Sequence, residues 1–380
     1  MSVPRSKLEQ RLLQKLADRE AQGNLRQLRT STGLVDFCSN DYLGLARSEQ
    51  LKQLIQQEAE KYKHLPVGST GSRLLSGNNE LFEELEKQVA AFHHAEAALL
   101  FNSGYTANVG LLSVLPQRGD TVFYDEASHA SMKDGLRLSF AKTYAFRHNN
   151  LDDLQQKLKH AMGQVFVVVE SVYSMDGDKA PLQELASLCQ QYGAALVVDE
   201  AHAVGLYGPK GEGLVTALGL EEQVFARIIT YGKAMGCHGA AVVGPKVLRD
   251  FLVNFSRAFI YTTALPTHDL LAIKCAYRLL PSLTKEREQV KALASQLYNE
   301  LNQTSGIRCS PRDSIILSVF VPDAKKLKPL AASLQQEGYD VRPVMSPTVP
   351  EGSERLRVIV HAFNTTTQTE GLAEAIRRHT

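Results

Sequence analysis

Two apolar segments that end near charged side chains constrain the fold of this chain more than any other feature of its sequence. Residues 195–198 are apolar and lead into Asp199, while residues 228–229 are apolar and Lys233 follows shortly after. Short apolar runs of this kind are typical of strands that are covered on both faces of a sheet. Because ligands bind at the carboxyl ends of such strands, Asp199 and Lys233 are candidates for chemistry.

Strand-like and helix-like segments alternate through most of the chain. Helical periodicity occurs, for example, over residues 79–92 and 181–192. Apolar strands separated by helices predict an α/β fold with a mainly parallel sheet. The expected strands are residues 97–101, 121–124, 142–146, 165–170, 195–199, 227–230 and 239–243.

Chain length and the changing pattern of expected helices and strands divide the 380 residues into three parts. Residues 1–45 are expected to form an N-terminal segment, residues 46–270 a large ligand-binding domain, and residues 271–380 a smaller C-terminal α/β domain. The smaller domain is inferred from a long helical region and three strands that follow it. These are residues 270–304 for the helical region, and 315–321, 341–343 and 356–360 for the strands.

Composition argues against several classes of function. The net charge of +1 gives no bulk attraction to nucleic acid or to an anionic membrane, and no apolar run is long enough to span one. Five scattered cysteines without a CxxC pair favour reduced thiols in the cytoplasm over disulfides or a zinc site. The run Asp176-Gly177-Asp178 lacks the spacing of an EF-hand loop, so no metal is expected. The polar start of the chain does not resemble a signal segment, which also predicts a cytoplasmic protein.

Lys233 and Asp199 together fit the needs of pyridoxal phosphate (PLP). This cofactor requires a lysine that forms a Schiff base and an acid that pairs with its pyridinium nitrogen. Partial burial among small residues would lower the pKa of Lys233 and supply neutral amine. Each residue also has a plainer interpretation, since Lys233 could be a surface lysine and Asp199 could cap a helix.

Several other polar side chains fit the same cofactor. Asn102-Ser103-Gly104-Tyr105 lies where a strand turns into a helix, and exposed amides at a helix N-terminus bind phosphate. Thr230 could reach that phosphate, and the ring of His129 could stack on the cofactor. His202 could donate to the cofactor's oxygen. Without this context His129 would be a solvated loop residue and His202 a core histidine.

The C-terminal domain offers a candidate site for a substrate carboxylate. Arg355 and Arg357 begin one strand, and an arginine fork matches a carboxylate. Since residues two apart on a strand point the same way, spacing does not choose between them. Glu170 follows a buried strand, where a carboxylate is costly unless it is hydrogen-bonded, so it is expected to be structural or part of the site.

On these motifs the chain resembles the α-oxoamine synthases, which are fold-type I PLP transferases. Members of that family condense an amino acid with an acyl-CoA and release CO₂. The motifs stand in family order between residues 26 and 361. They are Ser39-Asn40-Asp41-Tyr42-Leu43-Gly44, Asn102-Ser103-Gly104-Tyr105, Ser128-His129-Ala130-Ser131, Ser174-Met175-Asp176-Gly177, Asp199-Glu200-Ala201-His202, Thr230-Tyr231-Gly232-Lys233 and Leu356-Arg357.

The resemblance implies a role for each matching residue. Lys233 would be the Schiff-base lysine and Asp199 the partner of the ring nitrogen, with His129 stacked over the ring. The implied cofactor-binding residues are Gly104, Tyr105, His129, Ser174, Asp199, His202, Thr230 and Lys233, together with Thr263, which would reach the phosphate of the neighbouring subunit in a homodimer. The implied substrate-binding residues are Arg26, Asn40 and Arg357.

Residues 259–266 resemble the branch of the family that condenses L-alanine with pimeloyl-CoA, or with a pimeloyl carrier protein. That reaction yields 8-amino-7-oxononanoate for biotin biosynthesis. The second proline usual in this stretch is replaced by Thr267. Alternatives within the family are 2-amino-3-ketobutyrate CoA ligase, 5-aminolevulinate synthase and serine palmitoyltransferase. An aminotransferase or a non-catalytic binding protein would be further alternatives, although intact Lys233, Asp199 and His129 disfavour the last.

Overall fold

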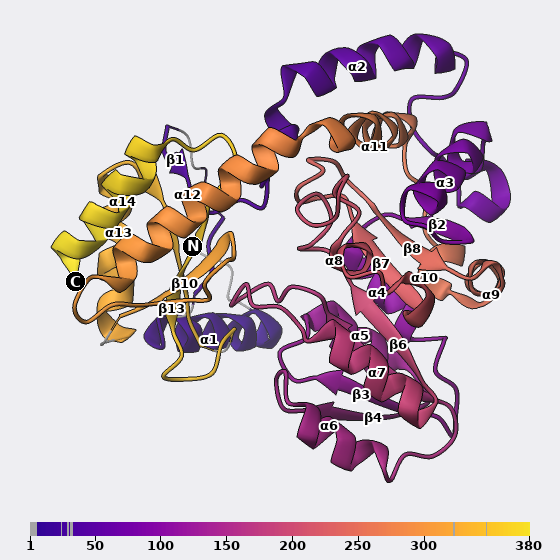
Figure 1. Ribbon diagram of the computed structural model, residues 1–380, viewed down its shortest axis with the longest axis horizontal. Coiled ribbons are helices and arrows are strands. Elements are labelled where there is room, and N and C mark those ends of the chain that lie inside the picture. The colour runs from indigo at the N-terminus through magenta and orange to yellow at the C-terminus, as the bar shows by residue number, and fades with distance from the viewer. Residues whose placement is uncertain (1–5, 24, 29, 31–32, 322–323, 347) are drawn as a thin grey trace.

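The computed structural model describes residues 6–23, 25–28, 30, 33–321, 324–346 and 348–380. It has two lobes side by side, a large α/β lobe and a smaller one that contains the C-terminus (Figure 1). The first five residues, on which the expected lack of a signal segment depended, lie outside the described residues. Within those ranges no helix is both long and apolar enough to cross a membrane.

A seven-stranded sheet forms the centre of the large lobe. All neighbouring strands are parallel except β8, which runs antiparallel to both β2 and β7. The predicted α/β class with a mainly parallel sheet is therefore confirmed. In spatial order the strands are β2 (Ala97–Phe101), β8 (Ala240–Gly244), β7 (Ala226–Thr230), β6 (Ala194–Asp199), β5 (Val165–Glu170), β3 (Thr121–Asp125) and β4 (Lys142–Phe146).

Helices cover both faces of this sheet, so its central strands are apolar on both sides. On β5, Val167 packs into the core on one face, whereas Phe166 and Val168 pack into the core on the other. Polar groups are consequently displaced to the strand ends. The first face is covered by α6 (Leu151–Leu158), α7 (Leu182–Tyr192) and α8 (Leu214–Ala217), and the second by α4 (Gly104–Leu112), α5 (Ala130–Leu138), α9 (Lys246–Phe255) and α10 (Arg257–Ile260).

A third core joins the outer edge of the large lobe to the small lobe. Here α11 (Thr267–Leu279) packs against both α2 (Glu49–Ala59) and α3 (Glu80–Phe92). The long helix α12 (Thr284–Asn302) then leads away to the small lobe, where it packs on α14 (Thr366–His379) (Figure 1). The packing partners thus change between α11 and α12, while the domain boundary at residue 270 stays a prediction.

The small lobe is built on a four-stranded antiparallel sheet. Its central strand β13 (Arg355–Ile359) lies between β12 (Arg342–Val344) and β10 (Ile316–Phe320), with β9 (Arg308–Ser310) at one edge. Helix α13 (Leu327–Gln336) packs on α14. The N-terminal segment joins this lobe, because β1 (Val35–Asp36) pairs in parallel with β11 (Tyr339–Asp340). Helix α1 (Lys7–Ala21) precedes it and begins with a capping box at Ser6.

Candidate active site

Asp199 ends β6 and is held there by two donors. The side-chain amide of Asn108 donates to Oδ2 at 2.7 Å, and the backbone N–H of Ala201 donates to Oδ1 at 2.9 Å. The residue is 5% exposed. A buried carboxylate that is fixed by hydrogen bonds offers a defined partner for a cationic ring nitrogen.

Lys233 lies beyond the end of the neighbouring strand β7, in the tight connection to β8. Burial lowers its pKa, and the charges of Asp199 and Glu170 oppose this without cancelling it. Glu170 ends β5, and burial together with the charge of Asp199 raises its pKa. Because a raised pKa favours the neutral form of Glu170, the charge repulsion between the two carboxyl groups is reduced. The amine is thus nearer to neutrality than an exposed lysine, which is what a nucleophile or base requires.

The start of α4 forms a polar cradle for a phosphate. Ser103 caps the helix, its Oγ accepting the N–H of Thr106 at 3.2 Å. A Cβ added to Gly104 would lie 2.4 Å from Oγ1 of Thr230, so glycine is needed where the start of α4 approaches the end of β7. Helix-start amides and a hydroxyl therefore converge, and the residues present fit the phosphate of PLP. Tyr105 is 47% exposed, and its hydroxyl donates to Asp134.

Burial lowers the pKa of two histidines of the candidate site, His129 and His202. Burial lowers the pKa of His129 despite the opposing charge of Asp199, and its backbone N–H donates to Oε1 of Glu170 at 2.6 Å. Burial together with the charge of Lys233 holds the pKa of His202 well below its usual range, and its Nδ1 lies 2.5 Å from the hydroxyl of Tyr42. Neutral rings suit stacking and hydrogen bonding without adding positive charge.

The structure distinguishes the two arginines of β13, which sequence spacing left open. Arg355 is buried, and its guanidinium donates to Asp176 and to the carbonyl of Ser353. Arg357 instead donates from Nε to the carbonyl of Ser174 at 2.7 Å and from Nη2 to Oδ1 of Asn40 at 3.1 Å. Its charge also lowers the pKa of Lys233. We therefore infer that Arg357 is the carboxylate-binding residue.

Conservative replacement of each arginine tests this inference. Arg357→Lys is expected to raise the KM for the amino acid by about tenfold or more, because a point charge cannot keep the bidentate geometry. Arg355→Lys should lower Tm and leave that KM within about twofold, since its partner is Asp176. Steady-state kinetics and thermal melts of both variants provide the measurements. The reverse pattern would assign the role to Arg355.

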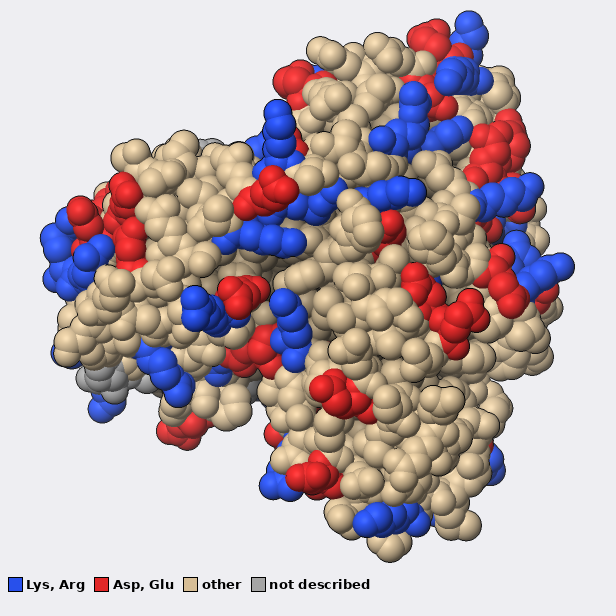
Figure 2. Space-filling view, viewed as in Figure 1, with Lys and Arg blue, Asp and Glu red and all other residues tan. Residues whose placement is uncertain are grey.

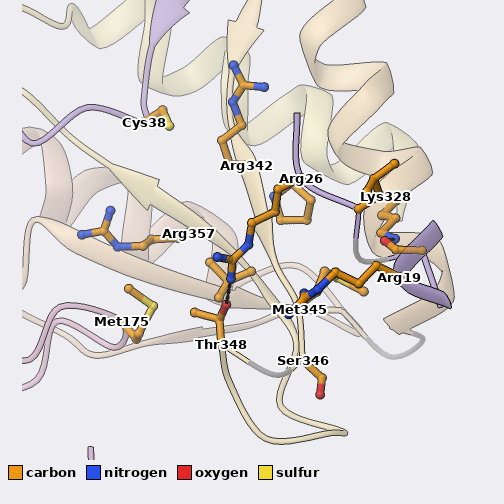
Figure 3. Close-up of a pocket in the computed structure, with 14 residues that line it drawn as sticks. Arg19, Arg26, Cys38, Met175, Lys328, Arg342, Met345, Ser346, Thr348 and Arg357 are labelled. Carbon is orange, nitrogen blue, oxygen red and sulfur yellow. Dashed lines mark hydrogen bonds between the residues drawn. The ribbon is translucent and has the colours of Figure 1, made fainter. Parts of the chain in front are cut away.

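A cavity of about 410 Å³ opens beside Arg357 (Figure 3). Arg26 lies in it, with Nη2 directed toward Oγ1 of Thr348 at 3.5 Å. None of the described lining residues is acidic, whereas several are cationic. Among the described residues, Arg342 is the one cationic lining residue that forms an ion pair, with Asp340. The cationic lining residues are Arg19, Arg26, Lys328, Arg342 and Arg357. The cavity is thus suited to an anionic ligand.

The remaining predicted residue, Thr263, lies beside the cradle of its own chain. Its carbonyl accepts from the side-chain amide of Asn102 at 2.9 Å, and the residue is exposed. Its expected contact with a neighbouring subunit stays a prediction. Sequence reasoning missed Asn108, although a polar residue one turn after Gly104 in a mostly apolar helix was the available signal. It also assigned no role to Tyr42.

Comparison with known proteins agrees with this geometry. The family model of class I and II aminotransferases matches residues 32–376. The 8-amino-7-oxononanoate synthase of Emericella nidulans is 42% identical over 368 residues, which cover 90% of this chain and 88% of the relative. Among solved structures, a variant of serine palmitoyltransferase from S. paucimobilis with a bound PLP–myriocin aldimine superposes with a TM-score of 0.88 at 28% identity, covering 99% of this chain and 98% of that one.

The 8-amino-7-oxononanoate synthase of Francisella tularensis superposes with a TM-score of 0.78 at 29% identity, over 91% of this chain and 97% of that one. These likenesses confirm a fold-type I, PLP-dependent enzyme of the acyltransferase type. The chain belongs to the class I and II aminotransferase family and, within it, to the α-oxoamine synthases that include the 8-amino-7-oxononanoate synthases.

Proposed function

We propose that this enzyme condenses L-alanine with a pimeloyl thioester, carried on CoA or on a carrier protein, and forms 8-amino-7-oxononanoate for biotin biosynthesis. One new carbon–carbon bond joins the α-carbon of alanine to the acyl carbonyl carbon. The carboxylate of alanine leaves as CO₂, and the thiol of the donor leaves with a proton. The relative from Emericella nidulans, at 42% identity along most of the chain, is the observation that carries this proposal.

Each residue of the site has a step to perform. Bound PLP supplies an electron sink for the pair left on the α-carbon. Asp199 keeps a proton on the ring nitrogen, and Lys233, with its lowered pKa, takes the α-proton of alanine and later returns a proton. Arg357 holds the alanine carboxylate until it leaves. His129 would cover one face of the PLP ring and would limit the access of water.

The cationic cavity supports an acyl donor with a free carboxylate at its far end. Arg26 and Arg19 have no ion pair with any described residue, so a carboxylate on the acyl chain would meet uncompensated positive charge there. Met175, Met345 and Val344 also line the cavity and could contact the methylene groups. A long acyl chain with an apolar end would have to desolvate these guanidinium groups, which disfavours the palmitoyl alternative.

A substrate matrix tests the proposed function. The holoenzyme is given alanine, glycine or serine with pimeloyl-, acetyl-, succinyl- or palmitoyl-CoA, while thiol release and product mass are followed. Alanine with the pimeloyl donor is expected to have the highest kcat/KM by at least about tenfold.

Arg26→Gln should raise the KM for the pimeloyl donor about tenfold, because a charged hydrogen bond is lost.

The matched control for that variant is Arg11→Gln, an exposed arginine on α1. It is expected to leave all substrates unaffected. A preference for glycine, serine or palmitoyl-CoA would reject the proposal in favour of another member of the family. We further propose that the enzyme is a cytoplasmic homodimer whose sites form at the subunit interface, as the exposed position of Thr263 beside the cradle permits.

A further inference from the structure

His148, which the site described above does not use, joins two loops of the large lobe. It follows β4, and its Nδ1 lies 2.8 Å from Oδ1 of Asp125, at the end of β3. Its Nε2 lies 2.8 Å from Oδ2 of Asp178, in the loop after β5. Asp125 is fully buried, so one end of this bridge is anchored inside the lobe.

Both ring nitrogens face carboxylate oxygens, which can only accept, so the ring donates twice and is an imidazolium. Burial alone would lower the pKa of His148, but hydrogen bonds to Asp125 and Asp178 outweigh it and raise the pKa to about 10. The other groups around His148 are Glu126, whose carboxylate accepts the backbone N–H at 3.1 Å, and Tyr173, whose ring is edge-on with its centroid 4.5 Å away. The side-chain amide nitrogen of Asn149 also lies 3.5 Å from Nε2. The bridge is therefore charged throughout the neutral range.

Asn149 reinforces the same connection. Its backbone N–H donates to Oδ2 of Asp125 at 2.9 Å, and its side-chain amide donates to Oδ2 of Asp178 at 2.7 Å. It adopts a left-handed conformation with φ of 51°, which is uncommon outside glycine. A conformation of this kind persists where the surrounding contacts determine it.

The bridged loops carry residues of the proposed active site. On one side, Asp125 accepts the N–H of Ala127 at 2.8 Å and leads directly to His129. On the other side, the carbonyl of Asp178 accepts the N–H of Tyr173 at 2.9 Å, immediately before Ser174. The carbonyl of Ser174 in turn accepts a hydrogen bond from Nε of Arg357.

The loop after β5 is also where the small lobe docks. Arg355 pairs with Asp176, and Oγ of Ser318 donates to the carbonyl of Met175 at 2.9 Å. A Cβ on Gly177 would collide with the carbonyl of Ile316, so the backbones approach closely there. Any shift of this loop would therefore move β13 and Arg357 relative to the large lobe.

We propose that His148 is a positioning residue, whose double hydrogen bond sets the distance between the cofactor-stacking His129 and the carboxylate-binding Arg357. Because the side chains of His148 and Asp178 are 29% and 26% exposed, we expect the bridge to contribute moderately to stability and chiefly to fix the geometry of the two loops. The inference rests on the proposed roles of His129 and Arg357 and is independent of the acyl donor.

His148→Asn tests this role, with His160→Asn as the matched control because His160 is an exposed histidine of the same lobe. We expect His148→Asn to raise the KM for the preferred amino acid about tenfold and to weaken PLP binding by a similar factor, with kcat changed less than about threefold. The KM for the acyl donor should not change. PLP binding is measured by titrating the apoenzyme and following its fluorescence, which requires no substrate.

A second variant, Asp178→Asn, removes the other side of the bridge. It should reproduce the same pattern, and the double variant should be no worse than either single one, because both changes break one interaction. If His148→Asn fails to fold, Asp178→Asn decides the question. A variant with lowered Tm but wild-type KM and PLP affinity would overturn the proposal, whereas no turnover of any amino acid by the wild type would overturn the proposed function instead.

The pH dependence of stability supplies an independent readout. The pKa of His148 is raised above its ordinary 6.5 in the folded protein. Its contribution to the free energy of unfolding is therefore complete below pH 6.5 and is lost as the pH rises through about 10. The difference in Tm between the wild type and His148→Asn is therefore expected to narrow on going from pH 7 to above 10. A constant difference across that range would show that the ring is not held as an imidazolium.

Discussion

Replacing Lys233 with alanine is expected to lower kcat/KM by at least about 10⁴-fold, the scale seen when a nucleophile is removed from a catalytic unit. The change removes the amine that links to the PLP aldehyde and also the base that moves the α-proton. The surroundings of Lys233 support this expected loss of activity. Burial lowers the pKa of the amine, while Asp199 and Glu170 lie close enough to oppose the shift. Exogenous amines could restore a fraction of the proton transfer without restoring the linkage.

Borohydride reduction followed by peptide mass analysis gives the most direct measurement. Wild-type enzyme should carry the reduced cofactor on Lys233, and the variant should carry none and should lose the visible absorbance of the linked cofactor. Lys246→Ala, at the exposed start of α9, is a matched control and should behave as wild type. An unchanged spectrum in Lys233→Ala, or a label on another lysine, would refute the assignment.

The strands of the large sheet could be predicted because their sequences are apolar on both faces. Residues 165–170 and 195–199 needed no tertiary information, since few structures other than a covered strand accommodate such runs. The reversed direction of β8 was not predicted, although the short connection from β7 contains the reason for it. A parallel neighbour would require a long crossover, whereas residues 231–239 form a tight return that holds Lys233.

Helix α5 was not predicted because its sequence is locally ambiguous. It contains Gly135, which weakens a helix in isolation. In the fold, Gly135 lies against α4, where a Cβ would come within 3.0 Å of the carbonyl of Asn108. The packing of two helices, which is absent from local sequence, thus explains both the glycine and the helix.

Pairings between distant segments were beyond sequence reasoning for the same reason. Two arginines at strand spacing are equivalent until Asp176, from the other lobe, pairs with Arg355 and leaves Arg357 as the candidate for binding a carboxylate. The contacts of His148 likewise join three segments whose order in the sequence gives no indication of their proximity. Candidate residues at strand ends can be predicted, whereas the partners that position them follow from tertiary structure.

Asp199→Asn should lower kcat by about 10²–10³-fold, the usual effect of removing one preorganised electrostatic group. Without the carboxylate the ring nitrogen loses its proton, and the cofactor becomes a poorer electron sink. The fold should tolerate the change, because Oδ1 of Asn108 has no partner among the described residues and its amide can turn to accept from the new side chain. Asp152→Asn, in the exposed first turn of α6, is the matched control.

The same substitution should make Lys233 of the apoenzyme more reactive. The charge of Asp199 raises the pKa of Lys233, so its removal lowers that pKa further and increases the neutral fraction at pH 7. An amine-specific reagent should therefore modify Lys233 faster in the variant, even though turnover is slower. Slower modification together with slower turnover would indicate a general disruption of the site, and unchanged turnover would remove Asp199 from the chemistry.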